Sequence, residues 1–164
     1  MLRTFFLLSL MAAPLWAQPK CGDPVKSKQF DFWVGYWAVY SNDQLVGHND
    51  IRPLMDGCVL HENWTGKSGS EGTSLNYYDP STGMWHQNWV WKNGTTLPKL
   101  SGGLENGAMV LKGVQKGKQG EIHHKITWTP NKDGTVRQFW EVSKDGGKTW
   151  QSSFDGLYKK AKKS

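Results

Sequence analysis

Ten short runs of β-favouring residues, separated by compact turn clusters, constrain this chain more than any other feature. The turn clusters read SNDQ, MDG, GKSGSEG, DPSTG, KNG, ENG, KGKQG, PNKDG and KDGGK. Nearly all of them supply Gly or Asn, which adopt the positive φ that tight hairpin turns require. The predicted strands are 33–40, 45–54, 59–65, 73–78, 84–91, 95–104, 108–115, 121–129, 135–143 and 149–158. Connections this short leave no room for parallel crossovers, so the sequence predicts an antiparallel meander.

A meander of this length either exposes two strand edges or closes on itself, and closure removes the edges at which chains aggregate. We therefore predict an all-β fold, an antiparallel up-and-down β-barrel of about ten strands. The segment FDFWVGYW, at 30–37, places five aromatic residues within eight positions. A first strand that pairs with both the second and the last strand is flanked on either side, so we expect aromatic side chains to pack on both of its faces. Gly35 would mark a bend or the close passage of another backbone.

The first 17 residues, MLRTFFLLSLMAAPLWA, have the features of a secretory signal peptide. Arg3 precedes an apolar run, and Ala17 is a suitable last residue before cleavage. We expect a lead-in at 18–29, the barrel at 30–158 and a solvated basic tail at 159–164. After residue 17 no segment is long and apolar enough to span a membrane. The sequence therefore predicts an exported protein, periplasmic or extracellular.

Cys21 and Cys58 are the two cysteines of the chain. In an oxidising compartment such a pair predicts one disulfide, which would tie the lead-in to a turn after the second strand. A redox or metal-binding thiol pair is the alternative, but it lacks CxxC spacing and neighbouring histidines. The formal net charge of +6 includes four lysines of the tail, and the other basic residues are scattered. Without a basic stripe, nucleic-acid binding is not predicted.

Alternation along the strands sorts the side chains into inner and outer sets. In 121–129 the inner set contains Ile122, His124, Ile126 and Trp128. Other strands repeat this combination of inward tryptophans with a polar neighbour two residues away. A buried polar group without a partner costs about 1–3 kcal/mol, so a cavity explains these polar residues better than a sealed core. The predicted ligand-binding residues are Glu62, Trp64, Gln87, Trp89, His124, Trp128, Gln138 and Trp140.

These residues favour a barrel that binds a small hydrophobic, amphipathic or aromatic molecule, with the tryptophans stacking on it and the polar groups orienting it. A filled interior, whose polar groups satisfy one another, remains an alternative. The protein would then interact with an envelope partner through its outer face. The candidate outward residues are His123, Lys125, Arg137 and Glu141.

His124 is a candidate haem or metal ligand, although no second ligand stands at a telling spacing. Glu62 and His124 could form a general acid–base pair. No Ser, Cys or second carboxylate accompanies them on a matched face, so an enzyme is not favoured. His61 and His86 fall on faces opposite the tryptophans and are expected at the surface.

The segment SKDGGKTW, at 143–150, matches the S-x-D-x-G-x-T-W pattern called an Asp-box. Asp145 can accept hydrogen bonds from turn N–H groups, Gly147 suits a positive φ, and Trp150 can pack back beneath the hairpin. The segment resembles the repeat hairpins of sialidases, but a single copy indicates a well-made turn rather than glycosidase chemistry. Alternation in 149–158 also places Trp150 on the same face as Phe154 and Tyr158.

Gly35, Tyr36 and Trp37 resemble the G-x-W signature on the first strand of lipocalins. The wider set QFDFWVGYW, GCVLHENWTG, SLNYYDPSTGMWHQNWV, ITWTP and DGGKTWQSSFDGLY is similar to an uncharacterised family of secreted bacterial proteins with a lipocalin-like, calycin-type β-barrel. This resemblance implies a fold and a compartment, and it implies no activity. A more distant likeness is to the ten-stranded nitrobindin-type barrels, whose haem is held by a histidine.

Overall fold

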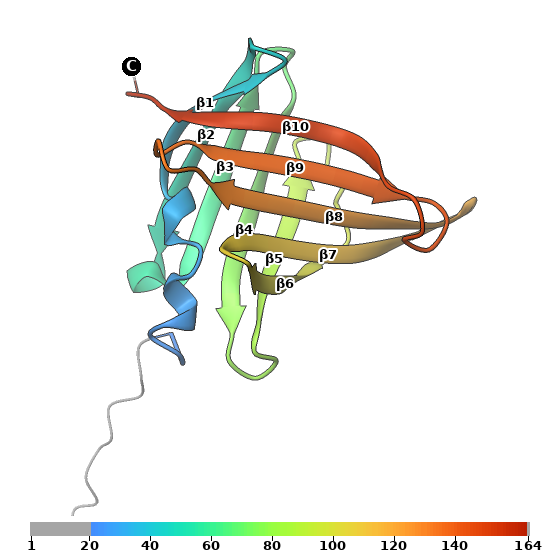
Figure 1. Cartoon of the computed structure of the whole chain (residues 1–164), viewed down its shortest axis with the longest axis horizontal. Helices are drawn as coiled ribbons and strands as arrows, with labels where there is room; N and C mark the ends of the chain where they lie inside the picture. The colour runs from blue at the N-terminus through green and yellow to red at the C-terminus, as the bar shows by residue number, and fades with distance from the viewer. Residues whose placement is uncertain (1–20, 164) are drawn as a thin grey trace, which may run out of the picture.

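The computed structural model describes residues 21–163, and the predicted signal peptide lies outside these described residues. Ten strands form one closed antiparallel barrel (Figure 1). They are β1 (Gly35–Ser41), β2 (Gln44–Leu54), β3 (Val59–Gly66), β4 (Glu71–Asp79), β5 (Met84–Trp91), β6 (Leu100–Glu105), β7 (Ala108–Gly117), β8 (Gly120–Pro130), β9 (Val136–Ser143) and β10 (Gln151–Lys160). Each strand pairs with the next, and β1 also pairs with β10. The predicted all-β up-and-down barrel is confirmed.

One strand is clearly shorter than predicted. The sixth strand was expected from residue 95, but β6 begins at Leu100, and Thr96 forms only an isolated bridge with Val90. Pro98 lies between Thr96 and Leu100 in the sequence, and a proline has no N–H to donate to the sheet. The longer β5–β6 connection that results carries Leu97 to the inside of the barrel end.

The first strand was predicted at 33–40, but β1 begins at Gly35, so Trp33 and Val34 are not part of it. Two 3₁₀ helices, η1 (Lys26–Lys28) and η2 (Asp31–Trp33), precede β1. A 3₁₀ helix has three residues per turn, so Phe30 and Trp33 come to the same side, and their rings stack with centroids 4.9 Å apart. These two rings close one end of the barrel together with inward rings from β1, β5 and β8. We call this cluster the plug: Phe30, Trp33, Trp37, Trp85 and Trp128.

Gly35 is a site of close approach, as predicted, but the neighbour is a side chain and not a backbone. Its φ is +143°, and a Cβ built on it would lie 2.3 Å from Nζ of Lys160. The Lys160 ammonium donates to the carbonyl oxygen of Val34 at 2.6 Å and lies 3.8 Å from the centroid of the Trp37 ring. The region expected to be a solvated tail therefore begins inside β10.

The predicted disulfide between Cys21 and Cys58 is confirmed. Cys58 follows the short helix η3 (Met55–Gly57), which comes directly after β2. The lead-in is also held by Trp85, whose Nε1 donates to the carbonyl oxygen of Lys26 at 3.1 Å. None of the helices within residues 21–163 has the length and apolar character needed to cross a membrane.

The Asp-box turn forms as predicted. The Asp145 carboxylate accepts from the backbone N–H groups of Lys148 and Thr149, and Trp150 Nε1 donates to the Gly147 carbonyl. The expectation that Trp150 shares a face with Phe154 is wrong, because a β-bulge between Ser152 and Phe154 shifts the register. Trp150 instead contacts the Lys125 ammonium, 4.5 Å from its ring centroid.

Candidate ligand-binding cavity

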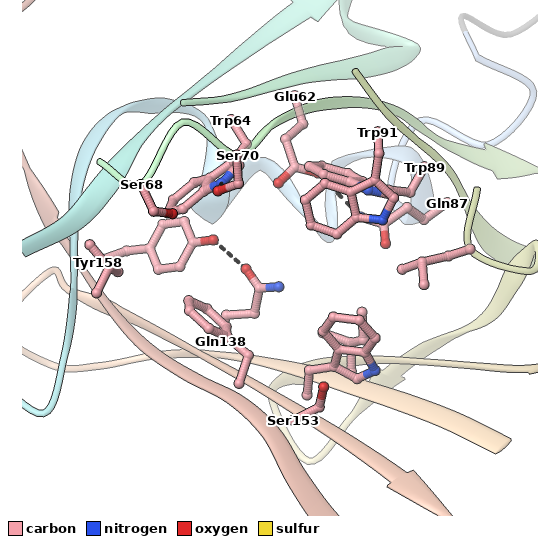
Figure 2. Close-up of a pocket in the computed structure, with 15 residues that line it drawn as sticks. Glu62, Trp64, Ser68, Ser70, Gln87, Trp89, Trp91, Gln138, Ser153 and Tyr158 are labelled. Carbon is pink, nitrogen blue, oxygen red and sulfur yellow. Dashed lines mark hydrogen bonds between the residues drawn. The ribbon is translucent and has the colours of Figure 1, made fainter. Parts of the chain in front are cut away.

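A cavity of about 300 Å³ lies inside the barrel. Figure 2 shows the side chains that line it, and on β5 the lining residues Trp89 and Trp91 lie at the opposite end of the strand from Trp85 of the plug. The volume of the cavity is at the lower end of the range for small-molecule sites, about 300–1,000 Å³. Its aromatic walls are Trp64, Trp89, Trp91, Trp140, Phe154 and Tyr158. Its polar residues are Glu62, Ser68, Ser70, Gln87, Gln138 and Ser153. Apolar side chains of Val46, Leu97 and Ile126 complete the lining.

Inward glycines explain why so many rings leave a hollow. Three wall rings each lie against a glycine, and a Cβ built on that glycine would stand 2.2–2.6 Å from the ring. The pairs are Trp64 with Gly47, Trp89 with Gly72, and Phe154 with Gly156. Each ring occupies the volume that a side chain at the glycine would fill, so it follows the wall and leaves the lumen open.

Glu62, on β3, is the ionisable carboxyl group of the cavity, and it is 4% exposed. Asn49 Nδ2 donates to its Oε1 at 2.7 Å, and Ser74 Oγ donates to its Oε2 at 2.5 Å. Gln87 Nε2 makes a longer bond to the same Oε2 at 3.4 Å. Burial raises the pKa of Glu62 from its ordinary value of 4.5 to about 7, against the opposing effect of the Ser74 and Asn49 bonds.

The donors around Glu62 are held in place by a second group of side chains on β4 and β5. Asn76 Nδ2 donates to Ser74 Oγ at 2.8 Å and to the Leu60 carbonyl at 3.2 Å. Gln87 Nε2 donates to Asn76 Oδ1 at 2.9 Å. Because both amide nitrogens donate in these bonds, the orientation of each amide is fixed by its partners.

Tyr158, on β10, links this network to the other side of the cavity. Its hydroxyl accepts from Asn49 Nδ2 at 3.3 Å and donates to Gln138 Oε1. Burial, followed by the nearby Glu62 charge, raises the pKa of Tyr158 well above its ordinary value. The phenol therefore stays protonated at neutral pH and acts as a fixed donor.

Six of the eight predicted ligand-binding residues line the cavity: Glu62, Trp64, Gln87, Trp89, Gln138 and Trp140. Trp128 does not. It is 1% exposed and lies in the plug, with ring centroids 5.2 Å from Phe30 and 5.4 Å from Trp33. Alternation places its side chain on the inner face correctly, but alternation does not say at which end of the barrel an inward residue lies.

His124 is buried, and its chemistry does not suit the predicted haem or metal ligand. Its Nδ1 accepts a hydrogen bond from Trp140 Nε1 at 3.2 Å. The indole can only donate, so Nδ1 carries the lone pair and Nε2 carries the proton of the neutral ring. A histidine binds a metal through a nitrogen lone pair, and here that lone pair is engaged. Burial, followed by the charge of His123, lowers the pKa of His124. The described residues also contain no group of three or more His, Cys, Asp or Glu able to hold a metal ion.

His86 is not at the surface as predicted, since it is 2% exposed. Its ring is on the outer face of β5 but is covered by neighbours. Nδ1 lies 2.8 Å from Ser101 Oγ on β6, and Nε2 lies 3.2 Å from Thr82 Oγ1 in the β4–β5 turn. These contacts give His86 a structural role outside the cavity.

Sequence reasoning missed the residues that surround Glu62. Asn49, Ser74 and Asn76 are each no more than 1% exposed and face inward from β2 and β4. The alternation rule applied to 45–54 and 73–78 places these three side chains on inner faces. The bonds of Asn49 and Ser74 to Glu62 follow from register, because Ser74 is opposite Glu62 and Asn49, opposite Trp64, is its diagonal neighbour.

No protein-family model matches this chain, and a comparison with curated proteins finds no match either. The class of protein is therefore defined by the fold and the cavity alone. It is a closed ten-strand antiparallel barrel, consistent with a lipocalin-like fold, with an aromatic-walled cavity at one end.

Proposed function

We propose that this protein is an exported binding protein, without catalysis of its own, that takes a small amphipathic or aromatic molecule into the cavity. The observation that carries the proposal is the hollow itself, which inward glycines keep open between aromatic walls. Aromatic walls with a few convergent polar groups are typical of small-molecule sites. The Cys21–Cys58 disulfide supports an oxidising compartment.

The polar residues that first suggested a cavity support this proposal only in part, because Glu62 and Gln87 are hydrogen-bonded within the chain. The alternative of an interaction protein has less support. Of its candidate outward residues, Lys125 pairs with Glu141 at 2.8 Å and Arg137 pairs with Asp155 at 2.7 Å. These charged groups already have partners in the folded chain.

The proposal is tested by titrating tryptophan emission with a panel of neutral aromatic alcohols, beginning with 2-phenylethanol. The wild-type protein is expected to change its emission and to melt at a higher temperature when the alcohol is bound. Trp140→Ala removes a wall of the cavity and should weaken binding by about tenfold or more, equivalent to about 1.4 kcal/mol.

Trp150→Ala is the matched control, since this indole is also half-buried but lies on the outer hairpin. It should bind the alcohol as the wild-type protein does. Equal loss of binding in both variants would contradict the proposed function, and so would the absence of binding by every alcohol of the panel and by its amine and carboxylate analogues.

A further inference from the structure

We infer that the ligand carries a protonated amine on an apolar or aromatic body, and that the carboxylate of Glu62 binds this amine. The inference rests on the proposed function and names the chemical class of its ligand. Three features of the cavity support it: the balance of charge, the direction of the hydrogen bonds, and the position of the aromatic rings.

The charge in the cavity is unbalanced. Glu62 is the acidic residue of the lining, and the described lining residues include no Lys, Arg or His. The hydrogen-bond partners of Glu62 are an amide, a hydroxyl and a second amide, from Asn49, Ser74 and Gln87. A buried carboxylate without a cationic partner is costly, and a bound ammonium group would supply that partner.

Acceptor positions of Glu62 and Gln87 are unused, while the indole Nε1 of Trp89 in the same lining is a buried donor with no partner within residues 21–163. A carboxylate has about four acceptor positions, and Glu62 receives three bonds from the chain. Both hydrogens of Gln87 Nε2 point to Glu62 and Asn76, so its Oε1 is also left as an acceptor. Asn49 Oδ1 is a further buried acceptor with no donor within residues 21–163, but Asn49 is not among the residues that line the cavity. The unused acceptors of Glu62 and Gln87 suit a ligand with N–H donors.

Aromatic rings line the same cavity as Glu62, and Figure 2 shows Trp64, Trp89 and Trp91 together with Glu62 and Gln87 in its wall. Trp89 and Trp91 meet edge to face with centroids 4.8 Å apart. Trp64 comes from the same strand as Glu62, two residues further along. Indole faces attract ammonium groups, and the attraction is strongest where water is excluded.

Glu62 is the group that controls the pH dependence of binding. The side chains that face it come from β2 (Asn49), β4 (Ser74 and Asn76), β5 (Gln87) and β10 (Tyr158). Tyr158 is the titratable group among them, and its pKa is raised far above neutral. The pKa of Glu62 itself is about 7, so the carboxylate that an amine needs forms as the pH rises through neutrality. Below that pH, binding of the amine releases the Glu62 proton.

The experiment compares three probes that share a phenyl ring and differ in charge: 2-phenylethylamine, 2-phenylethanol and 3-phenylpropanoate. Binding is measured by calorimetry at about pH 5.5 and at about pH 8. At the higher pH we expect the amine to bind about tenfold more tightly than the alcohol, and the carboxylate to bind most weakly. The preference for the amine should shrink at the lower pH.

Glu62→Gln should abolish the preference for the amine, so that amine and alcohol bind alike. Glu121→Gln changes the net charge by the same amount at a carboxyl that is 52% exposed on β8, and it should keep the preference. If Glu62→Gln does not fold, a measurement on the wild-type protein still tests whether Glu62 binds the amine. Below about pH 7, the binding heat of the amine should vary with the ionisation heat of the buffer, because a proton is released.

Three results would overturn the inference. The alcohol or the carboxylate could bind the wild-type protein as tightly as the amine, or Glu62→Gln could keep the amine preference, or the wild-type protein could release no proton. In each of these cases binding to the cavity, and with it the proposed function, would still stand. If no probe binds and the alcohol panel also fails, the proposed function falls and this inference falls with it.

Discussion

The indole of Trp89 lies against Gly72 so closely that a Cβ on this glycine would stand 2.2 Å from the ring atom Cζ2. Gly72→Ala must therefore displace the ring into the lumen or separate β4 from β5. We expect the free energy of unfolding in urea to fall by about 1–3 kcal/mol, as in other overpacked sites. Probe binding should weaken in the same variant, because the displaced ring takes up cavity volume.

Gly103→Ala is the matched control for this variant. Gly103 also lies inside a strand, β6, and a Cβ built on it meets no atom within 4 Å. Its replacement should leave stability within about 0.5 kcal/mol of the wild-type value and leave binding unchanged. If Gly72→Ala behaved in the same way as Gly103→Ala, the glycine–indole contact would not be what keeps the cavity open.

The buried carboxyl of Glu62 predicts an unusual dependence of stability on pH. Its pKa rises from 4.5 to about 7 on folding, so the folded state holds this proton more tightly than the unfolded state does. The contribution of Glu62 to stability is therefore complete below about pH 4.5 and is lost as the pH rises to about 7, a decrease of about 3 kcal/mol.

The measurement is the difference in unfolding free energy between the wild-type protein and Glu62→Gln across this pH range. Burial lowers the pKa values of His86 and His124, which makes stability fall as the pH drops below their ordinary value of 6.5. Both histidines are present in both proteins, so their effect cancels in the difference. A difference that stays constant with pH would show that Glu62 is not protonated in the folded state at mildly acidic pH.

Lys160 joins the last strand to the first. Its ammonium donates to the Val34 carbonyl and lies over the Trp37 ring at 3.8 Å. Lys160→Ala removes a charged hydrogen bond and a cation–π contact, and should lower the unfolding free energy by about 1–2 kcal/mol. Lys159→Ala, at the neighbouring position over Tyr40, should cost less than about 1 kcal/mol. Equal effects in the two variants would contradict this account of barrel closure.

The Cys21–Cys58 disulfide closes a loop with a sequence separation of 37 residues. Replacing both cysteines with serine should lower stability by about 3–4 kcal/mol, because the unfolded chain is no longer cross-linked. The bond lies at the plug end, so probe affinity should change little under conditions where the variant remains folded. A large loss of affinity in the folded variant would show that the lead-in helps to shape the cavity.

The strands and the disulfide could be predicted from the sequence because their signals are local. Alternation and turn residues mark each hairpin, and a single pair of cysteines leaves one possible bond. The plug could not be predicted in the same way. A short apolar run such as FDFW suits either a strand or a helical turn, and tertiary packing decides between them.

For the site residues, the sequence predicts whether a side chain faces inward or outward, but not where along the barrel it lies. Trp128 and Trp140 both alternate inward, yet one packs in the plug and the other lines the cavity. Position along the barrel depends on strand register and bulges, which arise from pairing across the sheet. Alternation places Glu62, Asn49 and Ser74 on inner faces, but the hydrogen bonds of Asn49 and Ser74 to Glu62 follow only once the register of β2, β3 and β4 is known.

The most direct test of a ligand-binding cavity is ¹⁹F NMR of protein labelled with 5-fluorotryptophan, titrated with 2-phenylethanol and 2-phenylethylamine. Single Trp→Phe variants assign the resonances. The account predicts that the resonances of Trp64, Trp89, Trp91 and Trp140 shift. The resonance of Trp150 and those of the plug tryptophans should not shift. No shift with either probe, or shifts confined to the plug or to Trp150, would contradict binding in this cavity.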